Sequence, residues 1–168
     1  MSHCIQAFIG REAELRLMAQ SYRSAFVISL DQGFAILPLT KELFDELGVA
    51  NGNQQEVQDE RFLYLCSRTF QAGQLFSQKI PTAYVETDYF GGSGSQGAAV
   101  WANGELIFRP AGTEEGVDNP SETVINAALQ KIGVVKGNCL DEFEAVGLGT
   151  HRSNEDWIDT QRRICRYG

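Results

Sequence analysis

Residues 98–109 read AAVWANGELIFR, and this stretch decides the main feature of the expected fold. Asn103 and Gly104 are residue types that accept the positive φ angles of a type I′ turn. They stand between two apolar runs, residues 98–102 and 105–109, which have the composition of β-strands. The stretch therefore predicts a β-hairpin with a two-residue turn.

The register of this hairpin follows from the length of its turn. A two-residue loop pairs Trp101 with Leu106 and Val100 with Ile107. Both faces of the hairpin are then apolar near the turn, which is typical of strands that are covered on both sides. We expect the hairpin to lie inside the sheet.

The rest of the chain alternates between strand-like and helix-like patterns. Apolar runs and short turns predict strands over residues 4–9, 25–30 and 34–39, and apolar positions at helical spacing predict helices over residues 11–22, 41–47, 62–76, 120–132 and from 153 onward. Strands joined by short turns pair antiparallel, since parallel pairs need longer crossovers. The order of elements predicts an α+β fold with a mainly antiparallel sheet and packed helices, formed by residues 1–168 as a single domain.

Capping residues predict where several helices begin and end. Thr40 is a suitable N-cap for the second helix, which Gly48 would end in a left-handed conformation. Asn119 followed by Pro120 predicts the start of the fourth helix, because proline is favoured at the first helical position. Ser153 begins an S-x-x-D capping signature for the last helix.

The composition is that of an ordinary globular domain. Hydrophobic residues make up 43% of the 168 residues and charged residues 21%, which argues against a disordered chain. No stretch has the roughly 18 consecutive apolar residues of a membrane span, and the first residues do not resemble a signal peptide, so we expect a cytoplasmic protein without a membrane partner. The four cysteines have no CxxC spacing, which predicts reduced thiols and no metal site: Cys4, Cys66, Cys139 and Cys165.

The net charge of −8 is concentrated in one part of the chain. Residues 110–159 contain ten acids and only three bases, so nearly all the excess lies there. Such a surface repels phosphate backbones and attracts cationic proteins, which disfavours nucleic acid as a partner. Solubility alone is the other explanation of this charge.

Residues 84–97, YVETDYFGGSGSQG, are the most unusual segment. In a strand, Glu86 and Asp88 point to the same face with Cα atoms roughly 6.5 Å apart, so they are suited to bind a cation, to meet basic side chains or to share a proton, or simply to face water. The loop from Gly91 to Gly97 has no Lys-Ser/Thr pair and precedes a strand-like run, so it lacks the context of a nucleotide-binding loop. We interpret it as a turn or a partner-contact loop, with no cofactor expected.

A second polar segment precedes the last helix. His151 and Arg152 stand beside Glu155 and Asp156, a group that suits a general base, a phosphate site or a structural helix cap. No motif of a nucleophilic or metal-dependent enzyme occurs in the chain. The sequence therefore favours a protein that is not an enzyme.

Four segments together resemble a family of small acidic bacterial proteins. These are AYVETDYFGGSGSQGAAVW, the Asn-Gly hairpin, INAALQKIGV and DEFEAVGLGTHRSNEDW, which occur in this order within residues 81–157. The family is uncharacterised, and some such small acidic proteins resemble toxin-immunity proteins, inhibitors that occlude the active site of a cognate toxin. The resemblance implies a basic protein toxin as the partner and brings no catalytic residues with it.

These observations lead to three alternative functions. The first is an immunity-type inhibitor that binds its basic partner through acidic and aromatic residues: Glu86, Asp88, Tyr89, Phe90, Glu114, Glu115, Asp118, Glu155 and Asp156. The second is a small enzyme or ligand-binding protein with a pocket formed by Glu86, Asp88, the Gly91–Gly97 loop and His151-Arg152. The third is a domain that associates with itself.

Overall fold

The computed structural model describes residues 2–50, 62–90, 93–113 and 123–167. Its centre is a six-stranded sheet of order β2-β3-β1-β4-β5-β6 in which each neighbouring pair is antiparallel. The strands are β1 (Ser2–Arg11), β2 (Ile28–Ser29), β3 (Phe34–Pro38), β4 (Thr82–Phe90), β5 (Ser93–Ala102) and β6 (Glu105–Thr113). The helices are α1 (Glu12–Ala19), α2 (Lys41–Ala50), α3 (Ser67–Phe76), α4 (Val124–Ile132), α5 (Glu142–Val146) and α6 (Asn154–Tyr167). The predicted α+β fold with an antiparallel sheet is confirmed.

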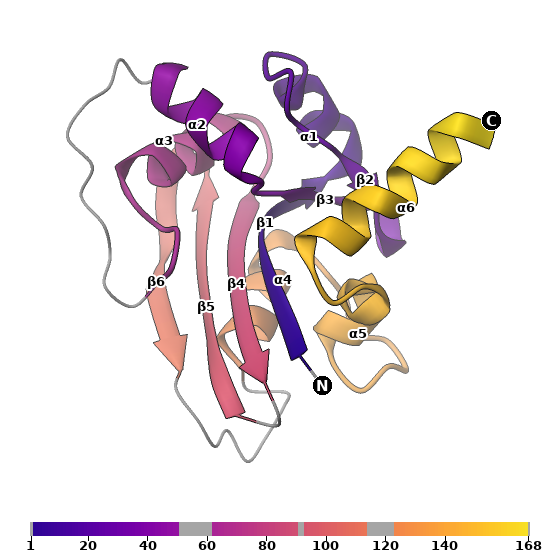
Figure 1. Ribbon diagram of the computed structural model, residues 1–168. Coiled ribbons are helices and arrows are strands. Elements are labelled where there is room, and N and C mark those ends of the chain that lie inside the picture. Colours follow the sequence, from indigo (N-terminus) through magenta and orange to yellow (C-terminus); the bar gives the residue numbers. More distant parts are fainter. Residues whose placement is uncertain (1, 51–61, 91–92, 114–122, 168) are drawn as a thin grey trace.

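Helices cover both faces of the sheet (Figure 1). Side chains alternate between the faces along each strand, so Tyr84 of β4 packs in one apolar cluster and Val85 in the other. The cluster with Tyr84 includes residues of α1, α2 and α3, and the cluster with Val85 includes residues of α4 and α6. We call these two sides of the sheet the α1–α3 face and the α4–α6 face.

The predicted hairpin joins β5 to β6. Asn103 and Gly104 have φ angles of 53° and 76°, as a type I′ turn requires, and Trp101 pairs with Leu106 as expected. The indole of Trp101 is fully buried on the α1–α3 face, where α3 covers it. The positive φ angles of Asn103 and Gly104 are therefore sufficient to explain the two-residue turn between β5 and β6.

The register beyond the turn differs from the prediction. Val100 pairs with Phe108 rather than with Ile107, because a bulge inserts one extra residue into β6. Ile107 is half-exposed as a result. β6 is also an edge strand, so β5 is the only strand of the hairpin that lies inside the sheet. The prediction that the whole hairpin lies inside the sheet was wrong. A bulge on an edge strand interrupts its free hydrogen-bonding edge and disfavours pairing with another chain.

Gly48 does not end α2. Thr40 caps the helix as predicted, since its hydroxyl oxygen accepts a hydrogen bond from the N–H of Leu43 at 3.1 Å. Gly48 lies inside α2 and is buried, and a Cβ added there would lie 2.5 Å from a guanidinium nitrogen of Arg68. Because Gly48 has no side chain, Arg68 can approach its backbone closely. This contact is long-range, and the local sequence does not indicate it.

Helices α3 and α4 begin several residues later than predicted. α3 begins at Ser67, and the buried Phe62 precedes it outside the helix, because the apolar spacing continues into a non-helical segment. α4 has Thr123 as its N-cap, whose hydroxyl oxygen accepts from the N–H of Asn126, so the helix begins later than the Asn119-Pro120 signal indicated. Asn119 and Pro120 lie outside the described residues.

The start of α6 is hydrogen-bonded to the first half of β1 (Figure 1). The side chain of Asn154 accepts from the N–H of Gln6 at 3.2 Å and donates to the carbonyl of the same residue at 3.1 Å. The N–H of Cys4 donates to the carbonyl of Arg152 at 2.7 Å. Ser153 caps α6, as predicted, by accepting from the N–H of the third residue after it. These contacts bring together residues that are 148 positions apart in the chain.

No helix in the described part of the chain is long and apolar enough to cross a membrane.

Candidate functional site

Glu86 lies inside the molecule and not on its surface. It is 5% exposed, and its carboxylate accepts hydrogen bonds from the backbone N–H groups of Leu63 and Tyr64 and from the hydroxyl of Tyr84, all at 2.7 Å. Three donors satisfy the carboxylate without solvent. Burial, assisted by the charge of Glu86, raises the pKa of Tyr84 well above its usual value, so this hydroxyl stays a donor. Glu86 ties residues 63–64 to β4, and the expectation that it contacts a partner does not hold.

Asp88 and Phe90 follow Glu86 on the same face of β4, but both are exposed. Phe90 is 79% exposed, an unusual degree for an aromatic side chain. In Figure 1 no described helix lies in front of this end of β4, because α1, α2 and α3 cover only the other end of the strand on this face. The sheet here presents an acid and an aromatic ring directly to solvent.

Glu155 and Asp156 lie near Asp88 because the residues that precede α6 pair with β1. Cys4 of β1 pairs with Asp88 on one side and forms a bridge to Ser153 on the other. Because adjacent strands are about 4.8 Å apart, the backbones of Asp88 and Ser153 are separated by on the order of 10 Å. Glu155 and Asp156 are exposed in the first turn of α6, directly after Ser153. We call the four residues Asp88, Phe90, Glu155 and Asp156 the junction surface.

Tyr89 points away from the junction surface. As a neighbour of Asp88 in a strand it lies on the α4–α6 face, where its hydroxyl oxygen accepts a hydrogen bond from the amide of Gln96 at 2.5 Å. It is half-buried. The prediction that Tyr89 and Phe90 act together on one surface does not hold, because strand alternation separates them.

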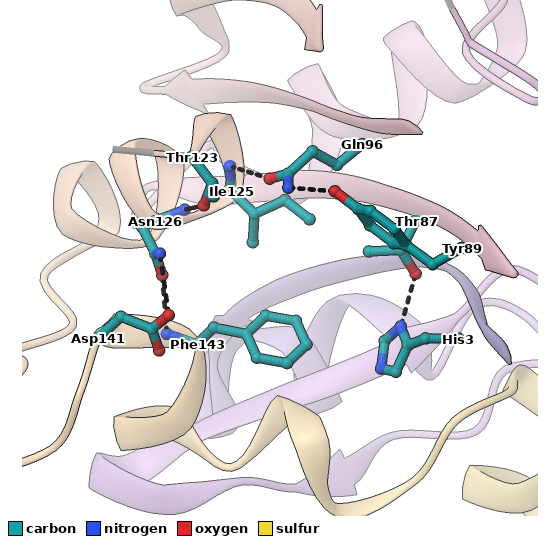
Figure 2. Close-up of a pocket in the computed structure, with 9 residues that line it drawn as sticks. All are labelled: His3, Thr87, Tyr89, Gln96, Thr123, Ile125, Asn126, Asp141 and Phe143. Carbon is teal, nitrogen blue, oxygen red and sulfur yellow. Dashed lines mark hydrogen bonds between the residues drawn. The ribbon is translucent and has the colours of Figure 1, made fainter. Parts of the chain in front are cut away.

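Tyr89 instead lines a cavity of about 260 Å³ between the sheet and the helices α4 and α5. Figure 2 shows Ile125, Gln96 and Tyr89 along one side of it and Asp141, Phe143 and His3 along the other. Thr87, Thr123 and Asn126 complete the lining. The cavity thus combines several polar side chains with three aromatic rings.

Two buried amides hold the cavity walls in place (Figure 2). Gln96 donates to the hydroxyl oxygen of Tyr89, and its carbonyl oxygen accepts from the N–H of Ile125 at 3.4 Å. Asn126 is 1% exposed; it donates to a carboxylate oxygen of Asp141 at 3.3 Å and accepts from the N–H of Phe143 at 2.9 Å. Each amide links two segments that line the cavity, so its shape is set before any ligand binds.

His3 stands at the end of the cavity farther from Asp141 (Figure 2). Its Nδ1 is 2.7 Å from the hydroxyl oxygen of Thr87, and its ring contacts that of Phe143 edge-on with centroids 5.5 Å apart. Burial lowers the pKa of His3, and the charge of Arg152 acts in the same direction, while hydrogen bonding to backbone groups opposes them. The imidazole is therefore mainly neutral at pH 7.

The residues of the alternative pocket do not come together. Glu86 and Asp88 are on the α1–α3 face, whereas His151 stacks edge-on against Trp157 in the apolar cluster of the α4–α6 face, with centroids 4.6 Å apart. Arg152 is exposed and contributes its backbone carbonyl to β1. The sheet separates the two pairs, so they cannot share one pocket.

Several of the predicted site residues lie outside the described residues: Glu114, Glu115, Asp118, Gly91 and Gly92. Among the described residues, no group of three or more His, Cys, Asp or Glu side chains is arranged to hold a metal ion. All four cysteines are free thiols in the structure, with Cys66 buried and the other three exposed.

Apart from Tyr89, the residues that line the cavity were not predicted as site residues, and α5 was not predicted. Asp141 caps this short helix by accepting from the N–H of Glu144 at 2.8 Å, and Gly147 ends it with a φ angle of 86°. An Asp and a Gly on either side of EFEAV are a recognisable helix signature. No local pattern indicates His3, since its position depends on the pairing of β1 with β4.

Comparisons of the chain with models of protein families, with curated proteins and with solved structures find no match.

Proposed function

We propose that the protein binds a basic protein through the junction surface and acts as an immunity-type inhibitor that occludes the active site of a basic toxin. The observation that carries this proposal is Phe90, which is 79% exposed beside Asp88, with Glu155 and Asp156 at the start of α6 on the other side of β1. Aromatic side chains are the usual central anchors of protein interfaces. Acidic neighbours select a partner of positive charge.

The acids of this surface are available to a partner. The ion pairs between described side chains involve Glu12, Asp45 and Asp159, and none involves Asp88, Glu155 or Asp156. The chain as a whole carries a net charge of −8. A local acidic surface on an acidic protein steers a cationic cleft during diffusion and raises the association rate at low salt.

Photo-crosslinking at position 90 identifies the partner without assuming its identity. A photoreactive phenylalanine analogue, p-benzoylphenylalanine, replaces Phe90 in the native host, and the matched control places it at Leu17. Leu17 is half-exposed on α1, beyond the opposite end of β1. We expect one basic protein to be captured from position 90 and not from position 17.

The purified partner then tests the contribution of charge. Charge reversal at both acids in one variant, Asp88→Lys with Asp156→Lys, should slow association by about tenfold or more at low salt. The difference in association rate from wild type should fall as salt rises. Glu42→Lys is the control, because Glu42 is an exposed acid in the first turn of α2. Its rate should stay within about twofold of wild type, since a distant charge is screened.

Inhibition is tested in cells that express the partner. If the partner is a toxin, co-expression of the wild-type protein protects growth. Phe90→Ala should lose protection while keeping the wild-type unfolding midpoint, because removal of an interface anchor weakens binding by about 30-fold or more. Equal capture from positions 90 and 17, or an association rate unchanged by charge reversal at the junction surface, would show that partner binding occurs elsewhere or not at all.

A further inference from the structure

The cavity on the α4–α6 face has the size of a site for a small molecule. Its volume of about 260 Å³ exceeds the roughly 150 Å³ that accommodates benzene in an engineered protein core, and it is just below the roughly 300 Å³ at which drug-sized ligand pockets begin. One ring with a short substituent fits this range. The lining comes from β1, β4, β5, α4 and α5, so the folded domain is needed to form it.

The lining carries one formal charge, and it is negative. Asp141 is the acid among the nine lining residues, and none of the nine is Lys or Arg. One oxygen of Asp141 accepts from the N–H of Glu144 and the other accepts from the amide of Asn126. A carboxylate has about four acceptor positions, so these two bonds leave capacity for a donor in the cavity. A cationic donor gains most from this acceptor.

The rest of the lining suits the apolar part of such a ligand. The rings of Phe143, Tyr89 and His3 and the side chain of Ile125 surround the space between Asp141 and the opposite end (Figure 2). Aromatic faces attract cations in addition to packing against apolar groups. The hydroxyl of Tyr89 already accepts from Gln96, and its own proton remains available to an acceptor on the ligand.

We propose that this cavity binds a small organic cation, an amine or ammonium group on a compact apolar body, with the cationic group next to Asp141. A carboxylate ligand is disfavoured, since it would place a second negative charge beside the first without a Lys or Arg in the lining to offset it. The site is separate from the junction surface, because Asp88 and Phe90 point to the other face of β4. It therefore stands or fails independently of the proposed partner binding.

Three probes of similar shape test the proposal: benzylamine, benzyl alcohol and benzoate. Each is titrated into the intact protein and followed by NMR, using the side-chain amide signals of Gln96 and Asn126 and the ring signals of Phe143. We expect benzylamine to bind with a dissociation constant on the order of 1 mM and at least about tenfold more tightly than benzyl alcohol, with benzoate weakest.

Asp141→Asn is the decisive variant. Asparagine is as good an N-cap as aspartate, so the cap of α5 is retained, while the charge and the oxygen that accepts from Asn126 are removed. The preference for benzylamine over benzyl alcohol should disappear in this variant, and it should persist in Asp45→Asn, an exposed acid on α2 that pairs with Lys41. Phe143→Leu removes one ring from the cavity and should weaken the binding of all three probes. This variant keeps the test informative if Asp141→Asn does not fold.

Phe90→Ala should leave probe binding unchanged, which separates this proposal from partner binding. Failure of benzylamine to shift the cavity signals, equal binding of benzoate, or an unchanged preference in Asp141→Asn would each overturn the assignment of a cation site.

Discussion

The substitution Glu86→Gln tests whether the buried carboxylate holds the structure together. Gln has nearly the same shape, but its amide nitrogen donates instead of accepting. In wild type, one carboxylate oxygen accepts from Tyr64 and Tyr84 and the other accepts from Leu63. The amide oxygen of Gln can keep the first two bonds, whereas its NH₂ group then faces the N–H of Leu63.

The expected loss of stability follows from these three hydrogen bonds. Hydrogen bonds to a charged group contribute about 1.5–3 kcal/mol each and neutral ones about 1 kcal/mol, so neutralising the acceptor weakens the two retained bonds by about 2 kcal/mol in total. The N–H of Leu63 loses its charged acceptor, which costs about 1–3 kcal/mol. Relief from burying a charge offsets about 1–2 kcal/mol of this sum. We expect a net destabilisation of about 2–3 kcal/mol.

Urea denaturation measures this difference, with Asp88→Asn as the matched control. Asp88 lies two residues further along the same face of β4 and is exposed, so its substitution removes the same charge without breaking a buried bond. With a urea dependence of about 2 kcal/mol per molar, Glu86→Gln should lower the midpoint by about 1–1.5 M. Asp88→Asn should change stability by less than about 0.5 kcal/mol. Hydrogen exchange at the amides of Leu63 and Tyr64 should accelerate only in Glu86→Gln.

A Glu86→Gln variant with the midpoint of wild type would refute this reasoning. Equal losses in Glu86→Gln and Asp88→Asn would also refute it, because the effect would then come from net charge rather than from the three buried hydrogen bonds.

Three further predictions concern packing, pH and thiols. Gly73→Ala should destabilise the protein by about 1–3 kcal/mol in urea, since the new Cβ would lie 2.6 Å from the indole of Trp101, whereas Gly149→Ala meets nothing closer than 3.6 Å and should be nearly neutral. The pKa of His3 is lowered on folding, so its contribution to stability is complete above about pH 6.5 and is lost as pH falls below that value; a smaller decline for His3→Gln than for wild type between pH 7 and 5.5 would check this. Thiol titration should find four reactive thiols in the unfolded protein. In the native protein three thiols should react rapidly, and the buried Cys66 should react slowly.

Features encoded by a few neighbouring residues were predicted correctly. The turn at Asn103-Gly104 depends on positive φ angles, which particular residue types adopt and which act over one or two positions. The caps at Thr40 and Ser153 need only a hydroxyl and an N–H three residues further on. Such signals are complete within a short window of sequence.

Features that depend on distant residues could not be predicted. The acids Glu86 and Asp88 occupy the same face of one strand, yet one is buried and the other exposed, because only Glu86 meets the backbone donors of residues 63–64. Gly48 fits a C-cap by its position in the sequence, and its actual role depends on Arg68. In each case the deciding partner lies some 20 residues away in the chain.

Local conformational preference and composition are enough to predict the class of fold, the main hairpin, most of the helices and the acidic character of the protein. Which side chains share a site depends on the tertiary structure. Strand pairing placed Asp88 beside the start of α6 and turned Tyr89 toward His3 and Asp141, and pairing is set by packing across the whole sheet. A junction surface and a cavity on opposite faces of one strand follow from that packing and from no single stretch of sequence.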